Sequence, residues 1–382
     1  MKIISAIILS CFCFITADAA DERIFIDAKI NGKPVRFAFD TGFELPYGLF
    51  SSDAEKLGLK ITPSDYKPSL GKIAIGTTEL CDLDFGITNF RAALGVIEIP
   101  TYVRKSMVGW IGWSALNQNI FSLDAAKQEI IFLTDLPEEL TAWTKVRVKT
   151  NSQLTLEIPG AGGINAVVVD TGKDRGIAIH PKKWQEWKAA HANQPATIDA
   201  SYMSGAGLVV KEESFAQEFS LGQLTLTDVP IMEANQAELV IDEQFTASLG
   251  LAALKRLDII IDGKHGIAYL RPKMTPPLPY EHNRLGAVFV PRNLQSNDLV
   301  AHVVDGSPAH KAGIRNDDIL LTIGELDATK WRTDPAVLPL SRFWNSPAGT
   351  KLELTLKRGD KIFKTTSVLR NILPPDSAKN SN

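Results

Sequence analysis

The chain reads VRFAFDTG at residues 35–42 and NAVVVDTG at residues 165–172. Each stretch is an apolar run of strand-forming residues that ends in an Asp-Thr-Gly triplet. Asp and Gly are both common in turns, so either triplet alone could be an ordinary turn. Two copies, each at the end of a similar apolar run, point instead to a structural unit that is present twice.

A second pair of matching segments follows the triplets. GWIGWSAL occupies residues 109–116, and SLGLAAL occupies residues 248–254. The interval from Asp40 to Gly112 is 72 positions (112 − 40), and that from Asp170 to Gly250 is 80 (250 − 170). The same motifs in the same order indicate one fold used twice. We expect a first lobe over residues 23–134 and a second over residues 145–272.

The rest of both lobes predicts a mainly β fold, because short runs rich in strand-forming residues alternate with turn residues. Asn31-Gly32 lies between two such runs and is a strong signal for a two-residue hairpin. Helical stretches are few, and we expect them only at residues 52–57 and 182–192. The strand-forming runs lie at residues 24–26, 35–39, 73–75 and 130–132.

The first residues predict export. An apolar run at Ile3–Ile15 precedes the small-x-small site Ala17-Asp18-Ala19, which together indicate a signal peptide over residues 1–19. The run is shorter than the roughly 17–25 residues that span a bilayer, so we expect no stable membrane span after cleavage and a periplasmic or secreted location. A buried N-terminal helix, an uncleaved anchor and a lipoprotein site at Cys11 are the alternatives.

Composition excludes several classes of function. The chain has 382 residues, of which 45% are apolar, enough for two or three packed domains. A formal net charge of −3 and no basic run with aromatic residues argue against nucleic acid as a partner. Only Cys81 lies beyond the signal, so no internal disulfide can form. The six histidines lack metal-binding spacing and no complete serine elbow is present, so we expect no metal and no cofactor.

Two aspartates can hydrolyse an amide without a metal or a covalent intermediate. One carboxylate takes a proton from water while the other acid donates a proton to the carbonyl oxygen. Two carboxyls close together share one proton, because both cannot easily ionise. The glycine of each triplet permits a tight loop whose N–H groups approach the carboxylate.

These motifs resemble those of the pepsin and retroviral aspartic peptidase superfamily, and most closely those of bacterial retropepsin-like proteins that carry both lobes in one chain. The resemblance covers residues 24–271 and implies a two-lobed acid protease fold. It makes Asp40 and Asp170 the catalytic pair. By the same resemblance the dyad is supported by Thr41, Gly42, Thr171 and Gly172, and the two loops are braced by residues 110–112 and 248–250.

The chain departs from the family pattern directly after each triplet, where the family has Ala or Ser. Phe43 and Lys173 stand there instead, and a lysine would favour the ionised form of a nearby carboxyl. The family also covers its cleft with a hairpin flap. Ser201–Val210, with strand formers around a glycine-rich tip, suits that role or is an ordinary hairpin. The matching first-lobe stretch, residues 66–75, suits it less well.

Prolines between residues 272 and 279 separate a third unit, which we expect at residues 285–373. There Ser307 is suited to begin a helix, Pro308 to be its first residue and Gly313 to end it. The unit resembles a bacterial PDZ domain, which binds protein C-termini at a sheet edge. By that resemblance Leu285, Gly286, Ala287 and Val288 would bind the peptide. The alternative is a small β domain that only packs against the lobes.

Two functions follow from these expectations. The first is an exported aspartic endopeptidase that cleaves a peptide or protein substrate and recruits it partly through the PDZ domain. The second is a peptide-binding or scaffolding protein whose peptidase fold has lost activity. Both aspartates and both glycines of the triplets favour the first, whereas Phe43 and Lys173 favour the second.

Overall fold

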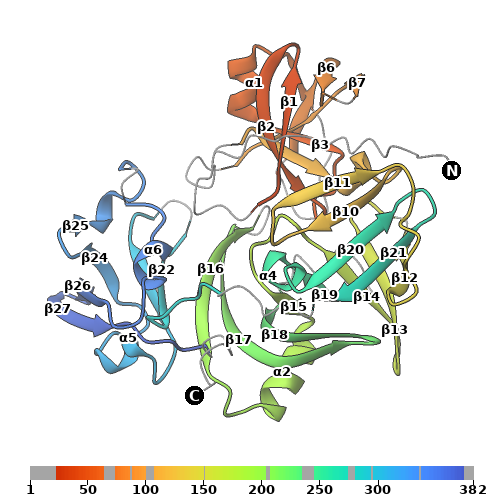
Figure 1. Cartoon of the computed structure of the whole chain (residues 1–382). Helices are drawn as coiled ribbons and strands as arrows, with labels where there is room; N and C mark the ends of the chain where they lie inside the picture. The colour runs from red at the N-terminus through yellow and green to blue at the C-terminus, as the bar shows by residue number, and fades with distance from the viewer. Residues whose placement is uncertain are drawn as a thin grey trace.

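The computed structural model is mainly β, with strands gathered into sheets of nine, twelve and six (Figure 1). The predicted signal peptide lies outside the described part of the chain. Among the described residues, no helix is both long and apolar enough to cross a lipid bilayer. The structure describes residues 23–63, 74–86, 88–99, 107–149, 151–203, 207–234, 245–273, 280–293, 296–334 and 337–373.

The nine-stranded sheet is built from the first part of the chain. Asn31 and Gly32 both have positive φ, 49° and 79°, and join β1 to β2 in the predicted hairpin. A helix, α1 (Ser51–Leu57), follows β3. The strands are β1 (Phe25–Ile30), β2 (Lys33–Asp40), β3 (Tyr47–Phe50), β4 (Ile61–Pro63), β5 (Ala74–Thr78), β6 (Cys81–Asp84), β7 (Asn89–Ala92), β8 (Gly95–Ile97) and β9 (Gly109–Gly112).

The twelve-stranded sheet runs from residue 120 to residue 272 and carries helices α2 (Pro181–Ala190) and α4 (Leu251–Leu254). Its first two strands, expected to close the first lobe, pair with each other, and β10 is hydrogen-bonded to β20 of the second. Its strands are β10 (Ile120–Asp124), β11 (Glu129–Leu133), β12 (Thr144–Lys149), β13 (Thr155–Gly160), β14 (Gly163–Val169), β15 (Ile177–Ile179), β16 (Ala196–Met203), β17 (Gly207–Leu221), β18 (Leu224–Glu233), β19 (Phe245–Leu249), β20 (Leu257–Asp262) and β21 (Ile267–Pro272).

Both sheets contain the same arrangement of four strands. In the first, β2 is parallel to β9, β9 is antiparallel to β3, and β3 is parallel to β8. In the second, β14, β19, β15 and β18 pair in the same order and directions. A helix follows β3 in one sheet and β15 in the other. The two Asp-Thr-Gly segments therefore stand at equivalent places, after β2 and after β14.

The six-stranded sheet forms the third unit and has its own apolar core. The hydroxyl of Ser307 accepts a hydrogen bond from the His310 N–H at 3.2 Å and caps α5 (Pro308–Lys311), and Gly313 follows with a φ of 86°. Helix α6 (Ser341–Trp344) packs on the sheet through Trp344, whose ring centroid lies 6.1 Å from that of Phe289 on β22. The strands are β22 (Ala287–Pro291), β23 (Leu299–Val303), β24 (Ile319–Ile323), β25 (Leu326–Asp327), β26 (Lys351–Arg358) and β27 (Lys361–Val368).

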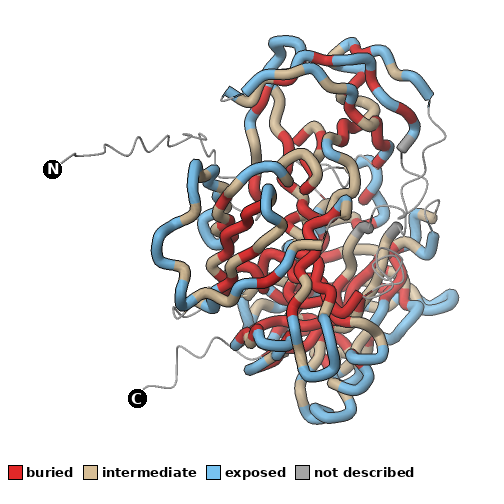
Figure 2. Tube along the Cα trace, turned by 90° about the vertical axis from the view of Figure 1, so that its right-hand side faces the viewer, coloured by how far each residue is buried: buried red, intermediate tan, exposed pale blue. Residues whose placement is uncertain are grey.

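One continuous apolar core runs through the first two sheets. Phe121 of β10 packs edge-on against Phe39 of β2 with ring centroids 6.2 Å apart, and against Trp113 at 6.1 Å. Figure 2 shows the buried residues along the interior strands and the exposed ones at turns and outer loops. Because Phe121 lies in a strand of the second sheet, its ring joins that sheet to β2, the strand that ends at Asp40.

Candidate active site

The two Asp-Thr-Gly triplets of the sequence meet in the structure. Asp40 ends β2 and Asp170 follows β14. A Cβ on Gly42 would lie 2.8 Å from the carboxyl carbon of Asp170, and one on Gly172 would lie 2.3 Å from Oδ2 of Asp40. Each glycine therefore faces the carboxyl of the other lobe. Only a residue without a side chain leaves room for the two carboxyls to approach.

Backbone N–H groups hold one oxygen of each carboxyl. Gly42 N donates to Asp40 Oδ1 at 2.9 Å, and Gly172 N donates to Asp170 Oδ1 at 3.1 Å. Both aspartates keep partial exposure to solvent, whereas the threonines beside them are fully buried. The carboxyls are thus fixed by their own loops and keep part of their surface exposed to solvent.

A reciprocal set of hydrogen bonds joins the loops through Thr41 and Thr171. Each threonine N–H donates to the hydroxyl of the other, at 3.0 Å and 3.1 Å. The Thr41 hydroxyl donates to the carbonyl of Val169 at 2.6 Å, and the Thr171 hydroxyl donates to that of Phe39 at 2.7 Å. Because each bond crosses from one lobe to the other, the set fixes the relative position of the two carboxyls.

The electrostatic environment of the pair favours a shared proton. The pKa of Asp40 is raised well above its ordinary value, first because of burial and then because of the negative charge of Asp170. A hydrogen bond between the carboxyls raises it further, whereas the Gly42 N–H and the charge of Arg23 lower it. Burial penalises the ionised form, and a second carboxylate repels it. One of the two groups therefore stays protonated where an isolated aspartate would ionise.

The downstream motifs support the two loops from behind. A Cβ on Gly112 would lie 2.2 Å from the carbonyl oxygen of Leu45, and one on Gly250 would lie 2.4 Å from that of Arg175. Gly112 N donates to Pro46 O at 3.0 Å, and Gly250 N donates to Gly176 O at 2.9 Å. The expected bracing segments therefore contact the chain just after each triplet at backbone distance.

Phe43 and Lys173, the residues directly after the triplets, have defined surroundings. The ring of Phe43 packs against Trp110 with centroids 5.4 Å apart, inside a small apolar cluster. The ammonium of Lys173 donates to the hydroxyl of Ser248 on β19 at 3.3 Å. Phe43 thus helps to pack the first loop, and Lys173 has a hydrogen-bond partner on the strand that supports the second.

Sequence reasoning did not find Gln153, which also touches the first loop. Its side chain is 1% exposed, and its amide nitrogen donates to the carbonyl of Gly42. Leu154 N donates to Thr41 O at 3.0 Å. A lone glutamine before a strand carries no signal in the sequence, and only the approach of the two lobes gives it a role.

The hairpin expected at Ser201–Val210 lies within a longer one made of β16 and β17, which pair from Ala196 with Ser214 to Met203 with Gly207. Its tip, residues 204–206, lies outside the described residues. The same holds for most of the first-lobe stretch at residues 66–75. The hairpin forms the edge of the second sheet, because the strand order ends β18-β17-β16.

Of the expected peptide-binding residues, Leu285 and Gly286 lie directly before β22, and Ala287 and Val288 are its first two residues. The N–H groups of Leu285 and Gly286 both donate to the side-chain oxygen of Asn283, at 2.9 Å and 3.0 Å. Gly286 has a φ of 70°. Two of the N–H groups expected to bind a ligand carboxylate are therefore engaged by a side chain of the same chain.

The described part of the chain contains no group of three or more His, Cys, Asp or Glu side chains placed to bind a metal ion. No protein-family model matches the sequence, and no curated protein matches it either. The candidate site consists of two carboxyls from equivalent strands, which are cross-linked by two buried threonines and partly exposed to solvent.

Proposed function

We propose that this chain is an exported aspartic endopeptidase of the two-lobed pepsin and retropepsin-like type, with a C-terminal PDZ domain that binds peptide C-termini. The observation that carries the proposal is the reciprocal placement of the two triplets, in which each glycine faces the opposite carboxyl. The duplicated four-strand arrangement and the threonine cross-links support it.

The chemistry requires one ionised and one protonated carboxyl. The raised pKa of Asp40 supports one proton on the pair. We write that proton on Asp40 and take Asp170 as the base; the steps are the same with the two roles exchanged. Asp170 takes a proton from a water molecule held between the carboxyls, and the resulting hydroxyl adds to the carbonyl carbon of the scissile bond. Asp40 donates its proton to the carbonyl oxygen, which gives a neutral tetrahedral diol.

Breakdown of the diol reverses these roles. A diol hydroxyl returns a proton to Asp40 as the carbonyl reforms, and Asp170 delivers its proton to the amide nitrogen as the carbon–nitrogen bond breaks. The products are an amine and a carboxylic acid, and the pair again holds one proton. The loop N–H groups on Asp40 and Asp170 keep both carboxyls oriented throughout.

The decisive experiment measures cleavage of an unstructured protein from acid to neutral pH. We expect cleavage that a statine-type inhibitor blocks and that either Asp40→Asn or Asp170→Asn abolishes. Asp258→Asn is the matched control, because Asp258 is an aspartate in an exposed ion pair with Arg271. Equal, negligible turnover by the wild type and all three variants would refute the enzyme and favour a binding protein, the function to which Phe43 and Lys173 point.

A further inference from the structure

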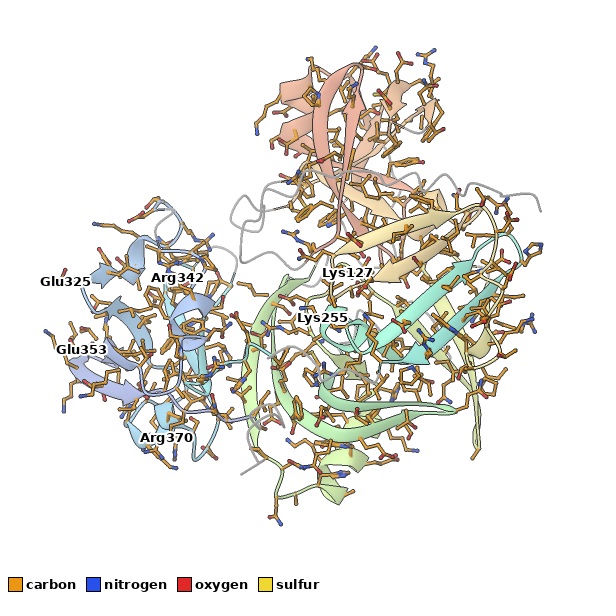
Figure 3. The ribbon with its side chains drawn as sticks, viewed as in Figure 1. Lys127, Lys255, Glu325, Arg342, Glu353 and Arg370 are labelled. Atoms are coloured by element: carbon orange, nitrogen blue, oxygen red, sulfur yellow. The ribbon has the colours of Figure 1, made fainter. Side chains whose placement is uncertain are left out.

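Two sheet edges meet between the second lobe and the C-terminal domain. β16 is the edge strand of the twelve-stranded sheet and β22 is that of the six-stranded sheet, and the two lie against each other (Figure 1). Ile198 of β16 is buried within the core of the C-terminal domain, and Ala200 and Val210 pack against that core. Side chains fill the space between the two ribbons (Figure 3). The hairpin is therefore docked on the edge where a peptide strand would add.

Asn283 connects the two edges. Its side chain is buried, and its amide nitrogen donates to the carbonyls of Ile198 and Ala287, both at 2.8 Å. Its amide oxygen accepts from the N–H groups of Leu285 and Gly286. The carbonyl of Asn283 in turn accepts from the Thr197 hydroxyl at 2.6 Å. One oxygen that accepts from two successive N–H groups is the arrangement that a terminal carboxylate would make.

The same hairpin is tied to the catalytic loop. Arg175 lies five positions after Asp170 (175 − 170), and its guanidinium donates to Asp199 of β16 at 2.8 Å. It also donates to the hydroxyl of Tyr280 at 3.4 Å, and that hydroxyl donates to Glu213 of β17. Glu213 is fully buried, and Asp199 is 8% exposed. Separating buried charges from their partners is strongly unfavourable, so a movement of the hairpin must involve Arg175.

We propose that the C-terminal domain restrains this hairpin, and that a peptide with a free C-terminal carboxylate releases it. The peptide carboxylate replaces the Asn283 oxygen on the N–H groups of Leu285 and Gly286, and the peptide strand replaces β16 along β22. The released hairpin changes the support of the loop that carries Asp170, through Arg175. The effect on cleavage rests on the peptidase function proposed above, whereas the competition for β22 does not.

The test uses the full chain and a fluorescein-labelled octapeptide that ends in a free Val-Phe carboxylate, with the same peptide amidated as a ligand control. We expect the free peptide, and not the amidated one, to increase hydrogen exchange in residues 196–203 and to raise kcat/KM. Peptide binding that leaves exchange in β16 unchanged overturns the competition. If the free peptide increases hydrogen exchange in β16 but leaves kcat/KM unchanged, the proposed coupling between the hairpin and cleavage is wrong. If exchange in β16 increases but the protein shows no cleavage that depends on Asp40, the peptidase function is refuted and the competition for β22 stands.

Two substitutions of Asn283 separate competition from loss of structure. Asn283→Ala removes the acceptor from the N–H groups of Leu285 and Gly286. This variant should bind the free peptide about tenfold more tightly, which is the effect of one charge-assisted hydrogen bond. Asn283→Asp keeps an acceptor in place, adds a negative charge and should bind it more weakly than the wild type. Equal weakening by both variants, or no binding to the wild type or to either variant, overturns the proposal. Glu353→Ala is the control, since Glu353 is exposed on β26 at the side of the domain away from β16 (Figure 3).

Discussion

Replacement of Thr171 by valine tests the cross-link that sets the catalytic pair. Valine has nearly the shape of threonine, so the substitution leaves no cavity and removes only the hydroxyl. That hydroxyl donates to the carbonyl of Phe39 and accepts from the N–H of Thr41, and the side chain is fully buried. Thr171→Val therefore leaves one acceptor and one donor without these partners in a site that water does not reach.

The magnitude follows from these two groups. Each buried polar group that loses its partner costs about 1–3 kcal/mol, so we expect the free energy of unfolding of the lobes to fall by about 2–6 kcal/mol. Activity should fall by a larger factor than the unfolded fraction explains, since misplacing reacting groups by about 1 Å can cost about 100-fold. The loss of stability and the loss of activity have the same cause, a displaced loop, so they should appear together.

Urea unfolding followed by tryptophan fluorescence measures the first effect, with cleavage under folding conditions measuring the second. Thr322→Val is the control: its hydroxyl bonds that of Thr355 at 2.8 Å in the C-terminal sheet, where both are partly exposed. We expect that variant to lose about 1 kcal/mol or less, because water replaces the bond. If Thr171→Val unfolds within about 1 kcal/mol of the wild type, the cross-link does not hold the loops as argued.

Three other substitutions have defined outcomes. Gly172→Ala places a Cβ 2.3 Å from Asp40 Oδ2, so cleavage should fall by about 100-fold or more while the unfolding midpoint moves little. Burial raises the pKa of Glu213 from 4.5 to about 7, at a site where its neighbours are Arg175, Asp199, Tyr280 and Asp174. The folded protein therefore keeps a proton that the unfolded chain releases. The contribution of Glu213 to the free energy of unfolding is full below about pH 4.5 and falls by about 3 kcal/mol as pH rises to about 7. Glu213→Gln should abolish this fall in urea titrations. An unchanged pH profile in the variant would contradict the assignment. Gly286→Ala forces a side chain onto a φ of 70° and within 2.3 Å of Ser307 Cβ, so unfolding of the C-terminal domain should become easier by about 2 kcal/mol while the lobes keep their stability.

Features that depend on local chemistry could be predicted from the sequence. The Asn31-Gly32 hairpin, the Ser307 cap and the mainly β class are confirmed, because each is determined by a few neighbouring residues. The meeting of Asp40 and Asp170 was expected only because the triplets repeat. Their spacing alone contains nothing that brings two loops 130 positions apart together (170 − 40).

Features that depend on distant partners could not be predicted. Residues 120–133 have the pattern of two strands. The alternation of apolar and polar residues does not predict which strand pairs with β10, and in the structure it is β20. Arg175, Asp199 and Glu213 look like surface charges in the sequence, since charged residues are seldom buried without a partner. Their partners come from a loop, two strands and the connector that carries Tyr280, and only the folded chain brings these together.

The pairing of β10 with β20 has a consequence for the candidate active site. A dyad made from two separate copies of one lobe would exist only at concentrations where the copies associate. Here two strands that follow the first sheet are hydrogen-bonded into the second, and Phe121 places its ring in the core shared by both lobes. The lobes therefore cannot separate without breaking strand pairing and exposing apolar surface, which makes the approach of Asp40 and Asp170 independent of protein concentration. The same connection leaves the outer edge of the second sheet, at β16, as the place where the C-terminal domain meets the two lobes. The proposed regulation at that edge would then act on a candidate catalytic pair that is already assembled.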